Sequence, residues 1–299
     1  MLPLWGSVID PFAVVKTDGQ VSDMVYRSGK LYVSTDTGVV NVFDVKTRKK
    51  IGTLRVQPTE NQIPFKACSA DHYDGKTAVV IDSGKDFREV YLISREGSRK
   101  IVDYSKGLLI KKLRFADADH LVLGLSSDMI VMMDLRSNTL LYQIQAGGGV
   151  FRDMALSRRG TLIAVADEGG EITMIDLKKG TKIKTLRGIN VDNINRIDYK
   201  SDTIISAGQD RRVGVYRRGG SYYLDSDFFI YAVGLSPSAR LGVYTDGTEN
   251  DLQVFTLADK TKTVRLRGGE VLFDTLIFAD EHLLIGAGED DKIYFWRIP

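Results

Sequence analysis

The sequence predicts an all-β protein with the architecture of a seven-bladed β-propeller. Three observations lead to this prediction. A short apolar pattern recurs about every 40 residues along the 299-residue chain. Each copy is accompanied by further short apolar runs separated by Gly, Asp and other turn residues, as expected for antiparallel strands joined by hairpins. One unpaired run near the N-terminus has the length needed to complete the last repeat.

The recurring pattern is an apolar residue, any residue, two apolar residues and then, in several copies, Asp at a turn. The seven copies lie at residues 40–44, 90–94, 130–134, 172–176, 213–217, 252–256 and 293–297. Their first positions are separated by 50, 40, 42, 41, 39 and 41 residues. Self-similarity at this period is typical of a repeat architecture and argues against two unrelated domains.

Each repeat contains four apolar runs, which one copy illustrates in order. In that copy the runs lie at residues 154–157, 162–165, 172–176 and 182–186. Runs this short cannot complete the face of a helix, and the Gly residues at the breaks would end one. Four antiparallel strands in about 40 residues form one blade of a propeller.

Two stretches carry a resemblance to a known family. Ser206–Asp210 and Gly286–Asp290, together with the order and spacing of the runs, resemble WD40 repeats. The resemblance implies that Asp210 and Asp290 cap a hydrogen-bonded cluster inside their blades. The Gly-His dipeptide of the family is missing, no Trp-Asp dipeptide occurs, and Trp296 is followed by arginine. The repeats are therefore degenerate, which resembles bacterial or archaeal propellers more than eukaryotic regulators.

The two ends of the chain are expected to close the ring. The last repeat stops after its third run, at residues 296–299, whereas residues 8–17 form a run without a repeat of their own. We expect this N-terminal run to complete the last blade, which removes a free sheet edge. Residues 1–299 then form a single domain. Its blades are predicted at about 18–54, 65–104, 107–146, 150–187, 191–225, 228–267 and 270–299.

Composition excludes several classes of protein. Hydrophobic residues make up 43% of the chain and charged residues 27%, which favours a packed core over disorder. Lys and Arg number 41 against 39 Asp and Glu, and this balance argues against a dedicated nucleic-acid binder. A single Cys excludes an intramolecular disulfide framework or a Cys-rich zinc site. Residues 1–12 lack a signal-peptide pattern and no long apolar run follows, so we expect a cytoplasmic protein.

The sequence offers few residues for catalysis or metal binding. His72, His120 and His282 lie in turns before the second strands of different blades, too far apart to share one ion. Cys68 lies in an innermost strand, where a lone Cys usually packs as a small apolar residue. No nucleophile elbow or similar catalytic frame is present. We therefore expect no catalytic residue, no metal, no cofactor and no enzymatic activity.

The mouth of the central channel is the candidate binding surface. In the WD40 family the top face, where the innermost strand of each blade begins, often holds a peptide partner. This chain places basic residues of blades 2 to 4 and aromatic residues of blade 6 there. The candidate residues are Lys66, Lys111, Lys112, Arg152, Asn195, Arg196, Phe229, Tyr231 and Asp274. We predict a non-catalytic scaffold that binds an acidic peptide with an apolar anchor, and the insertion at residues 57–64 enters the same face.

Other interpretations stay open. Each top-face charge can simply be solvated at a strand end. Basic turns of the opposite face lie at 46–50, 178–182, 217–218 and 260–262. They either block sheet association or bind an acidic partner, an anionic membrane or RNA. Residues 216–219 resemble the Phe-Arg-Arg-Gly motif of phosphoinositide-binding propellers, although at a different spacing. A faint likeness to accessory propellers encoded beside bacterial nitrate reductases suggests an assembly role in a respiratory enzyme. The expected oligomeric state is a monomer.

Overall fold

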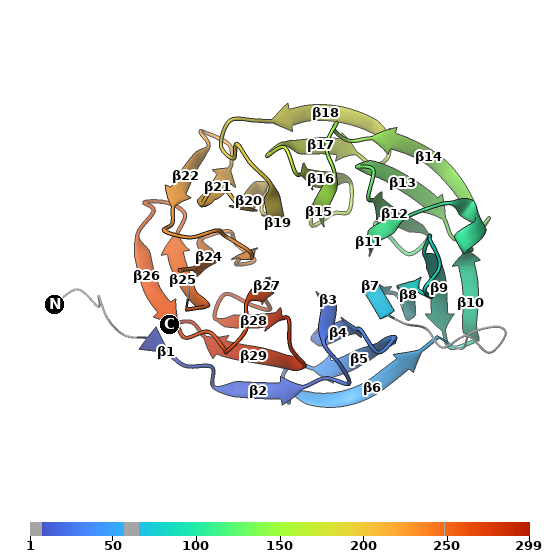
Figure 1. The fold of residues 1–299 in the computed structure, drawn as a ribbon, viewed down its shortest axis with the longest axis horizontal. Coiled ribbons are helices and arrows are strands. Elements are labelled where there is room, and N and C mark those ends of the chain that lie inside the picture. Colours follow the sequence, from blue (N-terminus) through green and yellow to red (C-terminus); the bar gives the residue numbers. More distant parts are fainter. Residues whose placement is uncertain (1–7, 57–65, 248) are drawn as a thin grey trace.

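The computed structural model describes residues 8–56, 66–247 and 249–299. In this part of the chain, seven sheets are arranged in a ring around a central channel, and the consecutive strands of each sheet pair antiparallel (Figure 1). The predicted all-β, seven-bladed propeller is therefore confirmed. Each sheet is one blade, and its strands follow one another from the channel to the rim.

The strands of each blade come in chain order, from the channel outward. Blade 1 consists of β3 (Val21–Arg27), β4 (Lys30–Thr35), β5 (Val39–Asp44) and β6 (Lys49–Arg55). Blade 2 consists of β7 (Lys66–Tyr73), β8 (Lys76–Asp82), β9 (Glu89–Ser94) and β10 (Gly97–Val102). Blade 3 consists of β11 (Ile110–Phe115), β12 (His120–Leu125), β13 (Met129–Asp134) and β14 (Thr139–Gln145). Blades 4 and 5 consist of β15 (Phe151–Leu156), β16 (Leu162–Asp167), β17 (Ile172–Asp176) and β18 (Thr181–Leu186); β19 (Ile194–Lys200), β20 (Thr203–Gly208), β21 (Arg212–Tyr216) and β22 (Tyr222–Asp225).

Blades 6 and 7 follow the same plan with strands from both ends of the chain. Their consecutive strands are β23 (Val233–Leu235), β24 (Leu241–Asp246), β25 (Asp251–Thr256) and β26 (Lys262–Leu266), then β27 (Phe273–Phe278), β28 (Leu283–Gly288) and β29 (Lys292–Arg297). The innermost strands all begin on the top face and end on the opposite face, which we call the bottom face. A 3-10 turn, η1 (Tyr104–Lys106), connects blades 2 and 3.

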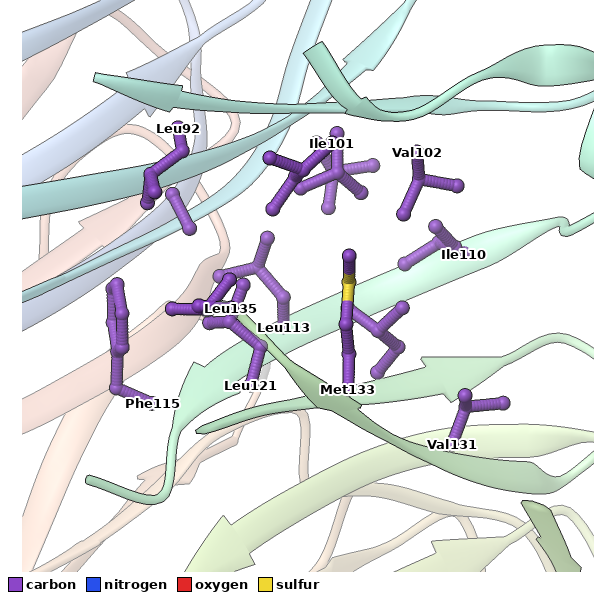
Figure 2. Packing of buried hydrophobic residues seen from close by; sticks show 14 of the residues in the cluster. Leu92, Ile101, Val102, Ile110, Leu113, Phe115, Leu121, Val131, Met133 and Leu135 are labelled. Atoms are coloured by element: carbon purple, nitrogen blue, oxygen red, sulfur yellow. The ribbon is translucent and has the colours of Figure 1, made fainter. Parts of the chain in front are cut away.

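The apolar residues of each blade pack against the next blade. Seven hydrophobic clusters are found among the described residues, and each draws its members from two neighbouring blades. Figure 2 shows the cluster between blades 2 and 3, where Leu92 and Ile101 face Leu113, Leu121 and Met133. The middle strands are thus covered on both sheet faces, which explains why their sequences read as nearly continuous apolar runs.

The N-terminal strand closes the ring as predicted. β2 (Ala13–Lys16) pairs antiparallel with β29 and forms the outermost strand of blade 7. The N–H of Thr17 extends this pairing by donating to the main-chain oxygen of Asp291 at 2.8 Å. The outer edge of β29 is therefore occupied by a strand from the other end of the chain.

A second N-terminal strand was not predicted. β1 (Val8–Ile9) pairs in parallel with β26, so blade 6 has five strands. Arg267 donates its main-chain N–H to Ile9 at 2.8 Å and its guanidinium to Asp10 at 3.0 Å. A strand of two residues has no alternating pattern that sequence reasoning could detect. The N-terminal segment therefore joins blade 6 to blade 7 in addition to closing the ring.

Candidate partner-binding face and central channel

Carboxylates on the innermost strands link several blades to their neighbours. An innermost strand has no sheet neighbour on its channel side, so its N–H groups need other acceptors. Asp71 accepts the N–H of Phe115 at 2.9 Å. Asp153 accepts the N–H of Ile197 at 3.0 Å, and the Asp198 carboxylate makes the same kind of bond to blade 6. Polar residues in these strands therefore hold the ring together across blade boundaries.

Arg114 and Asp23 form a buried ion pair in the channel, although they belong to blades 3 and 1. The two terminal guanidinium nitrogens of Arg114 donate to Asp23 at 2.8 and 3.0 Å. Burial alone would raise the pKa of the Asp23 carboxyl, but the cations of Arg114 and Lys112 outweigh it and lower that pKa below its usual range. Both members of the pair are therefore charged at neutral pH.

Lys112, Arg196 and Asp274, three of the predicted partner-binding residues, belong to the same layer of the channel. Lys112 donates to Asp153 at 2.5 Å. Arg196 donates to the main-chain oxygen of Asp274 at 2.7 Å, and its second contact, to the Asp274 carboxylate, is 3.7 Å long. Burial raises the pKa of Asp274, against the opposing effect of Arg196. These three side chains lie inside the channel and not on the exposed rim.

Lys66, Lys111 and Arg152 form a basic arc on the top face, on consecutive blades. All three side chains are exposed, and Arg152 donates to Asn195 at 3.1 Å. No acidic side chain lies within 4 Å of their charged groups in the described ranges. Burial lowers the pKa of Lys111, and the nearby cations of Arg88 and Arg152 lower it further. The basic arc is therefore a region of uncompensated positive charge.

A hollow of about 140 Å³ lies at the top mouth of the channel, beside the basic arc. Its lining includes Cys68, Lys111, Phe151 and Arg152. Sequence reasoning missed Phe151, and it missed that Arg88 lowers the pKa of Lys111. The lengthened hairpin between β8 and β9, which carries Arg88, was the sequence feature that could have indicated this. The insertion at 57–64, expected on this face, lies outside the described residues.

Three aromatic side chains from blade 6 form a cluster at its start. The ring centroid of Phe228 lies 5.3 Å from that of Phe229 and 6.4 Å from that of Tyr231. Phe229 is 43% exposed. Asn195, which binds Arg152, also donates to the main-chain oxygen of Ile230 at 2.8 Å. Blade 6 lies across the channel from blades 2 and 3, which carry Lys66 and Lys111 (Figure 1). Asn195 of blade 5 contacts both Arg152 and Ile230, so it lies between the basic arc and the aromatic cluster on the other side of the ring.

The two turn aspartates lie in hydrogen-bonded clusters. Asp210 accepts a bond from the side-chain amide of Asn190 at 3.1 Å. Asn190 in turn accepts the hydroxyl of Ser206 at 2.5 Å. Asp290 accepts the hydroxyl of Tyr294 at 2.9 Å. Sequence reasoning missed Asn190, which lies 20 residues before Asp210 along the chain.

The histidines make local contacts at separate places: His72 lies in β7, His120 begins β12, and only His282 lies in the turn before a second strand, where all three were expected. His72 stacks on Tyr32 with 4.4 Å between ring centroids, and His120 lies 2.8 Å from Asp117. His282 contacts a main-chain oxygen near the C-terminus. Within the described ranges, no three His, Cys, Asp or Glu side chains gather as metal ligands. No helix in the same residues is long and apolar enough to cross a membrane.

Blades of four or five strands, closure by an N-terminal strand and Asp-centred turn clusters define a seven-bladed β-propeller, the fold of WD40 repeat proteins. No family model matches the sequence. An uncharacterized WD repeat-containing protein of Synechocystis sp. is 23% identical over 136 residues, a match that covers 44% of this chain and 37% of that protein. A chain in the crystal structure of a mitotic checkpoint complex has a TM-score of 0.80 at 16% identity. That match covers 100% of this chain and 95% of the other, and it concerns the fold alone.

Proposed function

We propose that this protein is a non-catalytic scaffold whose top face binds a segment of another protein. The basic arc carries the proposal, because three exposed cations on consecutive blades have no acidic partner within 4 Å in the described part of the chain. The WD repeat relative and the propeller fold support protein binding in general terms. The segment that this face would bind is acidic and carries an apolar anchor.

The charge of the basic arc favours an acidic segment. The pKa of Lys111 is lowered, because partial desolvation of its ammonium group and the like charges of Arg88 and Arg152 both disfavour its protonated form. A carboxylate placed among these cations would relieve that repulsion. Charges of this kind steer association and select partners more than they add affinity, so we expect binding to weaken strongly with salt.

The aromatic cluster provides the place for the apolar anchor. Phe229 and its neighbours present ring surface to solvent across the channel from the basic arc. Aromatic residues are enriched among the contacts that dominate binding energy at protein interfaces. A peptide with acidic residues at one end and a large apolar residue at the other would therefore contact both surfaces.

The basic turns of the bottom face support a membrane or RNA adaptor less well. Lys50 lies 2.5 Å from Asp18, and the ammonium of Lys260 lies 4.5 Å from the ring centroid of Tyr222. Several of these cations thus have an acid or an aromatic ring beside them. Less of their charge is available to a polyanion than at the basic arc.

The partner can be identified by affinity purification from the native organism with mass spectrometry. The variant K66E/K111E/R152E reverses the basic arc, and we expect it to lose the partners that the wild type retains. A matched control, K46E/K49E/K178E, reverses three exposed lysines in bottom-face turns and should keep those partners. If the first variant keeps every partner, the top face is not the binding site. If only the control loses them, a bottom-face adaptor replaces the proposal.

One form of this function is an accessory role for a bacterial respiratory enzyme such as nitrate reductase, carried out in the cytoplasm. A subunit of such an enzyme among the purified partners would support it. Partners without any connection to respiration would remove this particular role and leave the general function in place.

A further inference from the structure

A second, larger cavity occupies the bottom half of the channel. Its volume is about 560 Å³, and all seven innermost strands or the turns after them contribute to its lining. Asp23, Lys112 and Arg196 line both this cavity and the small hollow at the top mouth. The channel ion pairs therefore form the floor between the two spaces. A volume of this size is within the range of sites for small molecules.

The charges in this cavity do not balance. Seven Lys and Arg side chains and four Asp side chains line it. Arg114, Lys112 and Arg196 are matched by the carboxylates of the floor, as described above. Lys200 pairs with Asp198 at 3.1 Å, and Arg27 pairs through two bonds of 2.8 and 2.9 Å with Asp71, which lies behind the lining.

Two cations are left over, and they are adjacent. Arg158 and Arg159 lie in the turn between β15 and β16, at the bottom mouth of the cavity. Both side chains are exposed, and neither lies within 4 Å of a carboxylate in the described ranges. The excess positive charge is therefore concentrated at one point of the wall.

The turn that carries these arginines is fixed against the neighbouring blade. Gly160 has a φ of +66°, and a Cβ at this position would lie 2.1 Å from the main-chain oxygen of Ala116 in blade 3. Only glycine permits this close approach together with this backbone conformation. The N–H of Gly160 also closes the turn by donating to Ser157 at 2.8 Å. The backbone that carries the two arginines is therefore held close to blade 3 at the bottom mouth.

We propose that this cavity binds a small anion with at least two carboxylate or phosphate groups, which Arg158 and Arg159 hold at the mouth. A cleft lined by one excess sign of charge concentrates ligands of the opposite sign, and guanidinium groups bind carboxylate and phosphate with paired hydrogen bonds. The exposed ring of Tyr73 adds apolar surface to the same mouth. This site is independent of the proposed peptide site on the top face.

The test is calorimetric titration of the purified full chain with citrate, tripolyphosphate and acetate in about 50 mM NaCl, where screening is weak. We expect saturable binding of citrate, tripolyphosphate or both, with a Kd of about 10–100 µM, and no binding of acetate. Citrate alone would indicate a carboxylate ligand, and tripolyphosphate alone a phosphate ligand. R158E/R159E should weaken binding by about tenfold or more. R158Q/R159Q removes the two charges without reversing them, so it tests the site even if charge reversal perturbs folding, and it should also weaken binding.

The matched control is R217E/R218E, which reverses another exposed Arg-Arg pair in a bottom-face turn, outside the cavity lining. Its affinity should stay within about twofold of the wild type. The proposal is overturned if neither polyanion binds saturably, or if the control loses as much affinity as R158E/R159E. Loss of anion binding in K66E/K111E/R152E alone would move the anion site to the top face and would also overturn it.

Discussion

Asp128 and Asp167, on neighbouring blades, converge beneath Gly147. A carboxylate oxygen of each lies 2.8 Å from the point where a Cβ of Gly147 would be. Asp128 is 1% exposed and Asp167 is 4% exposed. Gly147 donates its N–H to one oxygen of Asp128 at 2.5 Å, and the other oxygen has no hydrogen-bond partner among the described residues. The loop above this pair leads directly into β15, which carries Arg152 of the basic arc.

This pair predicts a stability that falls as the pH rises. Burial, with a further contribution from Asp167, raises the pKa of Asp128 to about 7, against the opposing bond from Gly147. Since the folded state holds its proton more tightly than the unfolded state, folding is favoured at low pH and this advantage is lost between about pH 4 and 7. Asp128→Asn cannot ionise. The free energy of unfolding of this variant minus that of the wild type should therefore increase by about 2–4 kcal/mol between pH 4 and pH 8.

Urea unfolding at pH 4, 6 and 8 measures this difference. Asp74→Asn, an exposed carboxylate in the turn between β7 and β8, is the control and should change stability by no more than about 0.5 kcal/mol at every pH. A constant difference between Asp128→Asn and the wild type across this range would show that Asp128 does not carry the proton.

Alanine substitutions at two adjacent glycines of the same site should differ in their effect on stability. Gly147→Ala would place a methyl group 2.8 Å from both carboxylates, whereas nothing lies within 4 Å of a Cβ at Gly148. We expect Gly147→Ala to destabilise the protein by about 1–3 kcal/mol, and Gly148→Ala to change it by less than about 0.5 kcal/mol. Thermal unfolding of the two variants under identical conditions compares them. Equal effects would mean that the loop moves freely enough to accept either methyl group.

The pairing of Lys112 with Asp153 predicts non-additive mutations. Asp153→Asn leaves the Lys112 ammonium without its carboxylate, and the loss should be about 3–5 kcal/mol because an unpaired buried charge is costly. Lys112→Met should likewise destabilise the protein. In the double variant the two costs should cancel in part, with a coupling energy of at least about 1 kcal/mol. Denaturant unfolding of the four proteins gives this value, and simple additivity would exclude the ion pair as a stabilising contact.

We expect truncation of the N-terminal strands to lower the stability of the protein in steps. Deletion of residues 1–17 removes β1 and β2, which exposes the outer edge of β29 to pairing with other molecules. We expect the Tm to fall by at least about 5 °C and oligomers to appear in light scattering. Deletion of residues 1–11 removes β1 alone and should have a smaller effect with no oligomers. Equal Tm values for both truncations would show that β2 does not stabilise the ring.

The repeat predicted the blades because the strands of a blade are neighbours along the chain. Hairpins join the strands of each blade, so the period of the apolar runs, the turns between them and the number of copies all lie within short windows. The closure of the ring was predicted from the same repeat. The last blade lacks a fourth strand and the N-terminal run lacks a blade, so the run was expected to complete that blade.

The candidate site was predicted in part. Lys66, Lys111 and Arg152 lie on the exposed top face, where the alignment of the innermost strands put them. Lys112 and Arg196 were expected beside them, but one step along a strand turns a side chain to another direction. Their side chains enter the channel, where carboxylates from other blades neutralise them.

Period, turns and composition in the sequence specify an all-β ring of seven blades closed by its N-terminus, because these features depend on neighbours in the chain. The partners of the charged residues depend on the closed ring instead. Arg114 meets Asp23 across 91 positions, and Asp128 meets Asp167 across a blade boundary. Such contacts have no local pattern, since they arise only when the packing angle between blades brings the innermost strands and top-face loops together. Charge balance, and with it the unpaired cations at both mouths of the channel, is therefore a property of the assembled ring.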